Sequence, residues 1–158
     1  MTATSDQPSA RTQRTLISVD AMGGDQGPAI VVAGCSASAL KNPDISFILH
    51  GPAETLEPLV AKRPELKGRC TIRDAQGVVT MDDKPSNVVR NGKGTSMWSA
   101  IESVRDNEAS VAVSCGNTGA LMALSMIRLK KLPGVNRPAI AVLYPSTNPQ
   151  GFNVLLDV

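Results

Sequence analysis

Aromatic side chains are scarce in this 158-residue sequence and make up only 3% of it. The four that occur are Phe47, Trp98, Tyr144 and Phe152. The core must therefore be built from aliphatic residues, and a stacking platform for single-stranded nucleic acid is excluded. A net charge of +2 leaves no electrostatic footprint for a polyanion, so we expect no nucleic-acid partner.

Cysteine and histidine are also rare. The three cysteines lie far apart and His50 is the single histidine, which excludes a disulfide framework and a Cys/His zinc cluster. Asp82 and Asp83 have no histidine or further carboxylate nearby, so we predict no metal site. His50 follows an apolar segment and is expected to be structural. No apolar run has the length of a membrane span.

Short apolar segments alternate with helical patterns along the rest of the chain. The expected strands are Leu16–Asp20, Ile45–Leu49, Cys70–Arg73, Val111–Ser114, Ala139–Tyr144 and Val154–Val158. The expected helices are Ala29–Leu40, one that opens at Pro52, Ser96–Arg105 and Ala120–Leu129. This alternation predicts an α/β fold: a mostly parallel, doubly wound sheet with helices on both faces.

Three stretches depart from this pattern. Residues 1–14 have no apolar period and predict a disordered tail, without the apolar centre of a signal peptide, so the expected location is cytoplasmic. Residues 74–95 are too long and polar for a tight connection and predict a functional loop, with one helical turn at Ser86–Arg90. Val154–Val158 is typical of a buried strand, and a buried strand with nothing after it suggests a fragment of a longer protein.

Two glycine-rich loops follow strands at the edge where ligands bind in parallel α/β sheets. Candidate ligand-binding residues in the first loop are Asp20, Gly23, Gly24 and Asp25, and in the second Ser114, Gly116, Asn117, Thr118 and Gly119. The second loop is the better anion cradle, because it lacks a carboxylate and leads into a helix. The alternative is that both loops are only strand-to-helix turns.

Other candidates carry charge or a thiol. Arg90, Lys93 and Arg137 could bind an anionic substrate, and Arg137 is either an ion-pair partner or a ligand clamp. Cys115, at a helix start, is either a nucleophile or a small apolar filler. The dinucleotide fingerprint, the Walker A lysine pattern and the Gly-x-Ser-x-Gly elbow are absent.

Five segments, taken in order, closely resemble one family. They are Val19–Asp25, Met81–Ser86 with Arg90 and Ser96–Met97, Ser114–Ala120, Arg137–Ala139 and Leu155–Val158. In this order they resemble the phosphate acyltransferase (PlsX) family of bacterial phospholipid synthesis, from Leu16 to the last residue.

The resemblance implies a fold similar to isopropylmalate dehydrogenases and phosphotransacetylases. It implies transfer of a fatty acyl group from acyl carrier protein to inorganic phosphate, with no cofactor. It also implies a cytoplasmic homodimer, peripheral at the membrane, whose acyl phosphate passes to the membrane acyltransferase PlsY. The family is about twice as long as this chain, which is therefore expected to be the N-terminal part, 15–158, of the catalytic domain and to be poorly stable and inactive alone.

Carried onto this sequence, the resemblance adds Ser86 and Ser96 to the phosphate-binding candidates and again includes Arg90, with Asn117 and Arg137 as the expected catalytic residues. Cys115 stands where the family usually has alanine, so we expect direct transfer without an acyl-enzyme. Two alternatives stay open: a dehydrogenase on the isopropylmalate-type fold, and a non-catalytic module that binds a partner.

Overall fold

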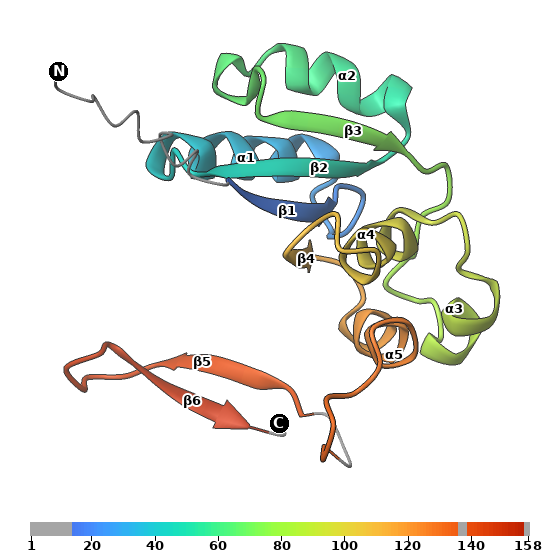
Figure 1. Cartoon of the computed structure of the whole chain (residues 1–158), viewed down its shortest axis with the longest axis vertical. Coiled ribbons are helices and arrows are strands. Elements are labelled where there is room, and N and C mark those ends of the chain that lie inside the picture. The colour runs from blue at the N-terminus through green and yellow to red at the C-terminus, as the bar shows by residue number, and fades with distance from the viewer. Residues whose placement is uncertain (1–13, 136–138, 157–158) are drawn as a thin grey trace, which may run out of the picture.

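The computed structural model describes residues 14–135 and 139–156. Its centre is a parallel four-stranded sheet in the order β3-β2-β1-β4, formed by β1 (Thr15–Asp20), β2 (Ile45–Gly51), β3 (Cys70–Asp74) and β4 (Val111–Ser114) (Figure 1). The chain moves from β1 through β2 to β3, then returns to the other side of β1 with β4. This reversal makes the carboxyl ends of β1 and β4 a topological switch point, where α/β proteins bind their ligands.

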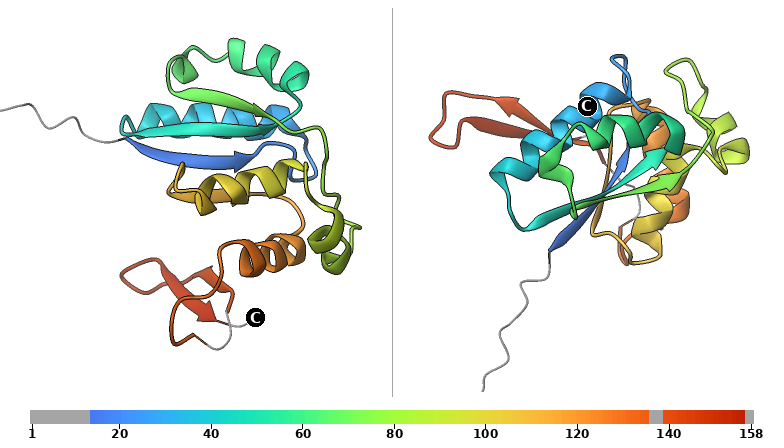
Figure 2. Two further views of the ribbon diagram at one scale, coloured as in Figure 1. Left: turned by 45° about the vertical axis from the view of Figure 1, so that its right-hand side comes forward. Right: turned by 90° about the horizontal axis from the view of Figure 1, so that it is seen from above.

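Helices cover both faces of this sheet, as the sequence predicts (Figure 2). On one face lie α1 (Pro28–Lys41), α2 (Ala53–Ala61) and the short 3-10 helix η1 (Pro64–Leu66). On the other face lies α4 (Ser96–Arg105), which contacts β1, β2 and β4. Farther out, α5 (Thr118–Arg128) packs on α4, and α3 (Pro85–Asn91) packs on α5. The fold is therefore a doubly wound α/β fold.

Alternation along β1 explains why both faces are covered. Val19 packs in an apolar cluster with Phe47 and Leu56 on the α1 face. Its neighbour Ser18 points to the opposite face, where its Oγ donates to the carbonyl of Ala100 in α4, 2.8 Å away. A second apolar cluster joins α3, α4 and α5, and its buried members are Val79, Val88, Met97, Ile101, Ala120 and Leu124.

The polar stretch before α4 is an ordered loop. Its helix, α3, is seven residues long and begins at Pro85, so it exceeds the single turn expected at Ser86–Arg90. A β-bridge pairs Gly77 with Thr95, and the amide of Ser96 donates to the carbonyl of Gly77 across 2.9 Å. The loop is thus closed at its base, and α3 is held beside α5.

The last two strands correct one prediction. β5 (Ala141–Pro145) and β6 (Phe152–Leu156) form a separate antiparallel hairpin (Figure 1). We expected Val154–Val158 to be a buried strand, but Val154 is 55% exposed and Leu156 is 66% exposed. The apolar pattern predicts the strand but not its exposure, because among the described strands β6 pairs only with β5.

Some predictions fall on residues outside the described ranges. Of the predicted tail, only Arg14 is described, and both Arg137 and Asp157–Val158 lie outside as well. Within 14–135 and 139–156, no helix combines the length and the apolar character needed to cross a lipid bilayer.

Candidate functional site

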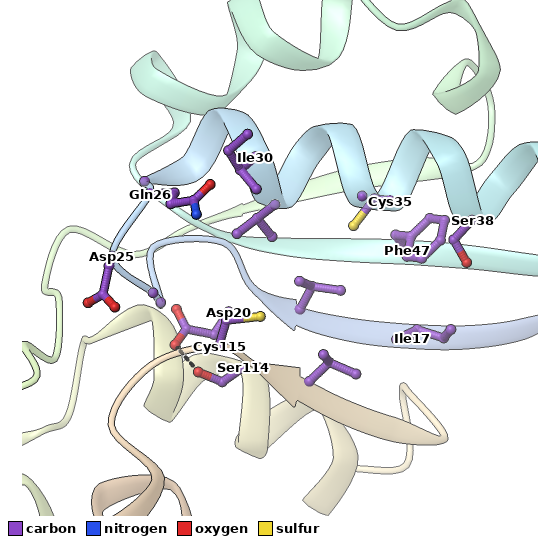
Figure 3. Close-up of a pocket in the computed structure, with 17 residues that line it drawn as sticks. Ile17, Asp20, Asp25, Gln26, Ile30, Cys35, Ser38, Phe47, Ser114 and Cys115 are labelled. Carbon is purple, nitrogen blue, oxygen red and sulfur yellow. Dashed lines mark hydrogen bonds between the residues drawn. The ribbon is translucent and has the colours of Figure 1, made fainter. Parts of the chain in front are cut away.

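Both glycine-rich loops lie at the switch point, one after each of two neighbouring strands (Figure 3). The parallel register pairs Asp20, the last residue of β1, with Ser114, the last residue of β4. The loop after β1 therefore meets the loop after β4, and we call these two the first and second corner. Sequence reasoning placed each corner after a strand, but it did not give the strand order that brings them together.

A chain of hydrogen bonds joins the corners at their base. Ser114 Oγ donates to Asp20 Oδ2 at 2.7 Å and accepts the amide N–H of Gly116 at 3.1 Å. Asp20 Oδ1 accepts the amide of Met22 at 3.3 Å. Asp20 is only 2% exposed, so a carboxylate that must be satisfied by hydrogen bonds sits beneath the loops. In this structure Asp20, Ser114 and Gly116 serve first to fix one corner to the other.

Gly23 is glycine because the second corner comes too close for a side chain. A Cβ at Gly23 would lie 2.8 Å from the Gly116 nitrogen and 2.8 Å from Ser114 Oγ. Gly24 lies against Cys115, and its φ of +100° also favours glycine. The first corner thus packs backbone to backbone against the second.

Asn117 spans the second corner and the loop before α3. Its Oδ1 accepts the amide of Ala120 at 3.0 Å and so caps α5. Its Nδ2 lies 3.2 Å from the carbonyl oxygens of Thr80 and Met81 and 2.8 Å from that of Asp83. The side-chain amide expected to be catalytic is therefore fully engaged by the protein itself. The Asx residue before a helix signals the cap, but no sequence signal indicates the three carbonyl partners.

The start of α5 leaves amides available for a ligand. Asn117 caps Ala120, and the Leu121 amide bonds to the Asn117 carbonyl, whereas the amides of Thr118 and Gly119 make no hydrogen bond to another described residue. Such free N–H groups at a helix start favour an anion. The second corner thus offers donors at Thr118 and Gly119 rather than at the Asn117 side chain.

Helix α3 also lies beside the start of α5. A Cβ at Gly119 would lie 3.0 Å from Cγ of Pro85, the first residue of α3. Pro85 therefore lies beside the first turn of α5, and the next residue of α3, Ser86, is exposed. Arg90 and Lys93 are exposed too and form no ion pair with any residue that the structure describes. These cations are available for an anionic ligand.

Ser96 lies deeper than the other candidates. It is 1% exposed at the start of α4, and its Oγ has no hydrogen-bond partner among the described residues. The neighbouring Met97 packs behind the second corner, with its Cε 3.3 Å from the position of a Cβ on Gly116. Ser96 therefore belongs to the layer beneath the corner.

A largely apolar cavity of about 560 Å³ opens beside both corners (Figure 3). α1 forms one wall, and the α1 faces of β1 and β4 form the floor; side chains that line it include Ile17, Ile30, Val31, Phe47 and Val113. Asp25 and Gln26 lie at the first corner, at one end of the cavity. Cys35 faces the interior, and burial raises the pKa of its thiol to about 12, so it is inert. Cys115 lines the same cavity and is exposed.

His50 is structural, as expected. Its Nε2 and Nδ1 each lie 2.8 Å from a serine Oγ, that of Ser18 and that of Ser99. Burial, and secondarily the charge of Arg73, lowers the pKa of His50 to about 4. The imidazole is therefore neutral near pH 7 and joins β2 to β1 and α4. Within the described ranges, no group of His, Cys, Asp and Glu side chains is arranged to hold a metal ion.

Together these features define a parallel α/β domain whose two glycine corners meet over an apolar cavity. Residues 15–158 match the family described as "Fatty acid synthesis protein", and the chain belongs to that family. It is 74% identical over its full length to a protein of Roseobacter denitrificans named "Phosphate acyltransferase", and covers 44% of that protein. Proteins with the same name are 73% identical in a Ruegeria species, over 100% of this chain, and 74% identical in Paracoccus denitrificans, over 90% of it.

The chain covers 42% of the Ruegeria protein and 39% of the Paracoccus protein. It thus spans less than half the length of these three curated relatives.

Proposed function

We propose that this chain carries the phosphate-binding corner of an acyltransferase of fatty acid and phospholipid synthesis. The reaction is transfer of a fatty acyl group from acyl carrier protein to inorganic phosphate, which yields an acyl phosphate. The single observation that carries the proposal is the pair of amides, Thr118 and Gly119, that make no hydrogen bond to another described residue, in a corner whose first residues, Ser114 and Cys115, line an apolar cavity. The shared name of the relatives, "Phosphate acyltransferase", supports the reaction class.

In this proposal the second corner holds the phosphate. The amides of Thr118 and Gly119 donate to its oxygens, and the Thr118 hydroxyl and the exposed Ser86 hydroxyl add further donors. Arg90 and Lys93 supply positive charge from α3 and the loop that follows it, and Arg137 is proposed as a further cation. The carboxylate of Asp20 does not compete strongly for this place, because it is buried and accepts two hydrogen bonds from the chain.

The chemical step requires a thioester next to the bound phosphate. A phosphate oxygen attacks the thioester carbonyl, the C–O bond forms, and the C–S bond breaks. The thiolate of the carrier leaves and takes up the proton that the phosphate loses, so the products are the acyl phosphate and the free carrier thiol. Holding both reactants in place can lower the barrier by up to about 7–11 kcal/mol in well-oriented systems.

The acyl chain is apolar, and the cavity beside the corners has the matching character. We also propose, as part of this function, a homodimer at the membrane surface that passes the acyl phosphate to PlsY.

The dehydrogenase alternative has no support from the names of the relatives, and the chain lacks a dinucleotide fingerprint after β1. The binding-module alternative has no support from those names either.

The deciding experiment measures release of free carrier protein from acyl carrier protein by the complete gene product, with and without phosphate. We expect release only with phosphate, together with a product that hydroxylamine converts to a hydroxamate. Release at the same rate without phosphate would show hydrolysis instead, and nicotinamide-dependent turnover would favour the dehydrogenase.

A further inference from the structure

We propose that Asn117 is a positioning residue, whose amide fixes the 80–84 turn and hence α3 against the start of α5. This inference rests on the proposed function, because it assigns Asn117 the task of setting where Ser86 meets the phosphate-binding amides. It replaces the direct catalytic role expected from the sequence.

The hydrogen bonds leave Asn117 almost no capacity for substrate. A primary amide has two N–H donors, and three carbonyl oxygens, those of Thr80, Met81 and Asp83, lie within 3.2 Å of Nδ2. Oδ1 is occupied by the amide of Ala120. The residue is 8% exposed, so its side chain points into the protein. A side-chain amide bonded in this way affects a ligand by positioning the backbone that it binds.

The turn that Asn117 binds, residues 80–84, is also closed by its own hydrogen bonds. Both the amide and Oγ1 of Thr80 donate to Asp83 Oδ2, each at 2.8 Å. The Asp83 carboxylate thus closes the turn. The backbone carbonyl oxygens of Thr80, Met81 and Asp83 all point to Nδ2 of Asn117. The next residues, Lys84 and Pro85, lead directly into α3.

Apolar packing brings α3 to α5, but it does not fix the register between them. Val79 and Val88 lie in one cluster with Ala120 and Leu124, and aliphatic contacts of this kind are not directional. Gly119 lies close to Pro85, so a shift of α3 along α5 would change which residues of α3 lie opposite the first turn of α5. The directional bonds of Asn117 therefore set the separation of Ser86 from the Thr118 and Gly119 amides.

The test uses two variants of the complete gene product that loosen the turn from opposite sides. Asn117→Ser keeps a cap for α5 but removes the donors to the three carbonyls. Asp83→Ala removes the acceptor of the two Thr80 bonds and leaves the α5 cap untouched. Asp74→Ala is the matched control: Asp74 Oδ1 accepts the amide of Ala53 at the start of α2 and Nε2 of Gln76, and within the described ranges it makes no hydrogen bond to Asn117 or to residues 80–84.

We expect both variants to speed amide hydrogen exchange in residues 79–91, while exchange in β1, β2 and α1 stays unchanged. We also expect a rise of about tenfold or more in KM for phosphate, since misplacement of a positioning group by about 1 Å can cost about 100-fold in rate. Asp74→Ala should change neither exchange in 79–91 nor KM. If Asn117→Ser fails to fold, Asp83→Ala alone decides.

Unchanged exchange in 79–91 in the variants that fold would overturn the inference. So would a loss of phosphate affinity in Asn117→Ser with exchange unaltered, because that result would mean direct contact with the ligand. Failure of the proposed function is a separate result: the wild-type protein would then release no carrier protein with phosphate, whereas the exchange measurements would still report on Asn117.

Discussion

Asp20 and Ser114 stand 94 residues apart in sequence, yet the Ser114 hydroxyl donates to Asp20 Oδ2 across 2.7 Å. Each ends its strand, and the two strands are neighbours in the sheet. This bond closes the base of both glycine corners, so its removal should affect both.

We predict that Ser114→Ala destabilises the protein by about 1–3 kcal/mol, because it leaves the buried Asp20 carboxylate short of a donor. Equilibrium denaturation measures this loss. Asp20→Asn tests the same link from the other side, and the double variant should cost less than the sum of the two single changes. Strict additivity would show that the two residues act independently.

Gly23→Ala should damage the first corner more than its single methyl group suggests. A Cβ there would lie 2.8 Å from the Gly116 nitrogen, so the corners must separate. We expect a clear loss of stability and of phosphate-dependent turnover in the complete gene product. Gly34→Ala is the matched control for stability alone, because Gly34 also lines the apolar cavity. A Cβ there meets nothing within 4 Å, and alanine favours the α1 helix by about 0.5–1 kcal/mol.

The stability of the domain should fall in acid because of His50. Its pKa is lowered from 6.5 to about 4 in the folded state, so the unfolded chain binds more protons between these values. The contribution of His50 to stability is therefore full above about pH 6.5 and is lost as the pH falls toward 4, at a cost of roughly 3 kcal/mol. Denaturation curves at several pH values measure this, and His50→Asn should flatten the dependence in that window. An equally steep dependence in His50→Asn would assign it to other groups.

Cys115→Ala should retain activity in the complete gene product. Cys115 is an exposed residue of the second corner, where a thiol nucleophile could in principle reach an acyl group. Direct attack by phosphate does not need it. We expect turnover within about twofold of wild type, because alanine keeps the Cβ that faces Gly24 and removes only an exposed thiol. A dead variant, or an acyl group trapped on the wild-type cysteine, would count heavily against direct transfer.

The 158-residue chain on its own should be poorly stable and inactive, and it should bind hydrophobic dyes. Val113 is 43% exposed on the floor of the cavity, and Leu143 and Leu156 of the hairpin are each at least 65% exposed. Apolar area of this kind contributes nothing to stability while it faces water. Dye fluorescence and a thermal melt provide the measurement; a cooperative melt together with turnover would contradict the prediction.

Much of the fold could be predicted from local pattern alone. Proline at the start of α1 and the short apolar runs fix the β1–α1–β2 unit, because these signals act over a few residues. The sequence pattern predicts that the last helix begins at Ala120, but α5 begins at Thr118, because Asn117 is its N-cap and the two residues after the cap are already helical. Burial of β6 could not be predicted, since it depends on what lies against the strand.

The candidate site was predictable in position but not in detail. Gly23, Gly24 and Gly116–Gly119 mark corners at strand ends, which is a local signal. The contact between the corners depends on β4 lying beside β1, and that is a property of the strand order. Likewise the residue type of Asn117 indicates a helix cap, whereas its bonds to Thr80, Met81 and Asp83 come from a loop more than 30 residues away.

The parallel register of β1 with β4 acts as a check on correct folding. Successive side chains of a strand point to opposite faces, so a slip of β4 by one position would turn Ser114 away from Asp20 and bring a different residue opposite it. A misaligned chain could still bury part of its aliphatic surface, but it would have no closed corners. Anion binding would thus distinguish the native strand register from a register shifted by one residue.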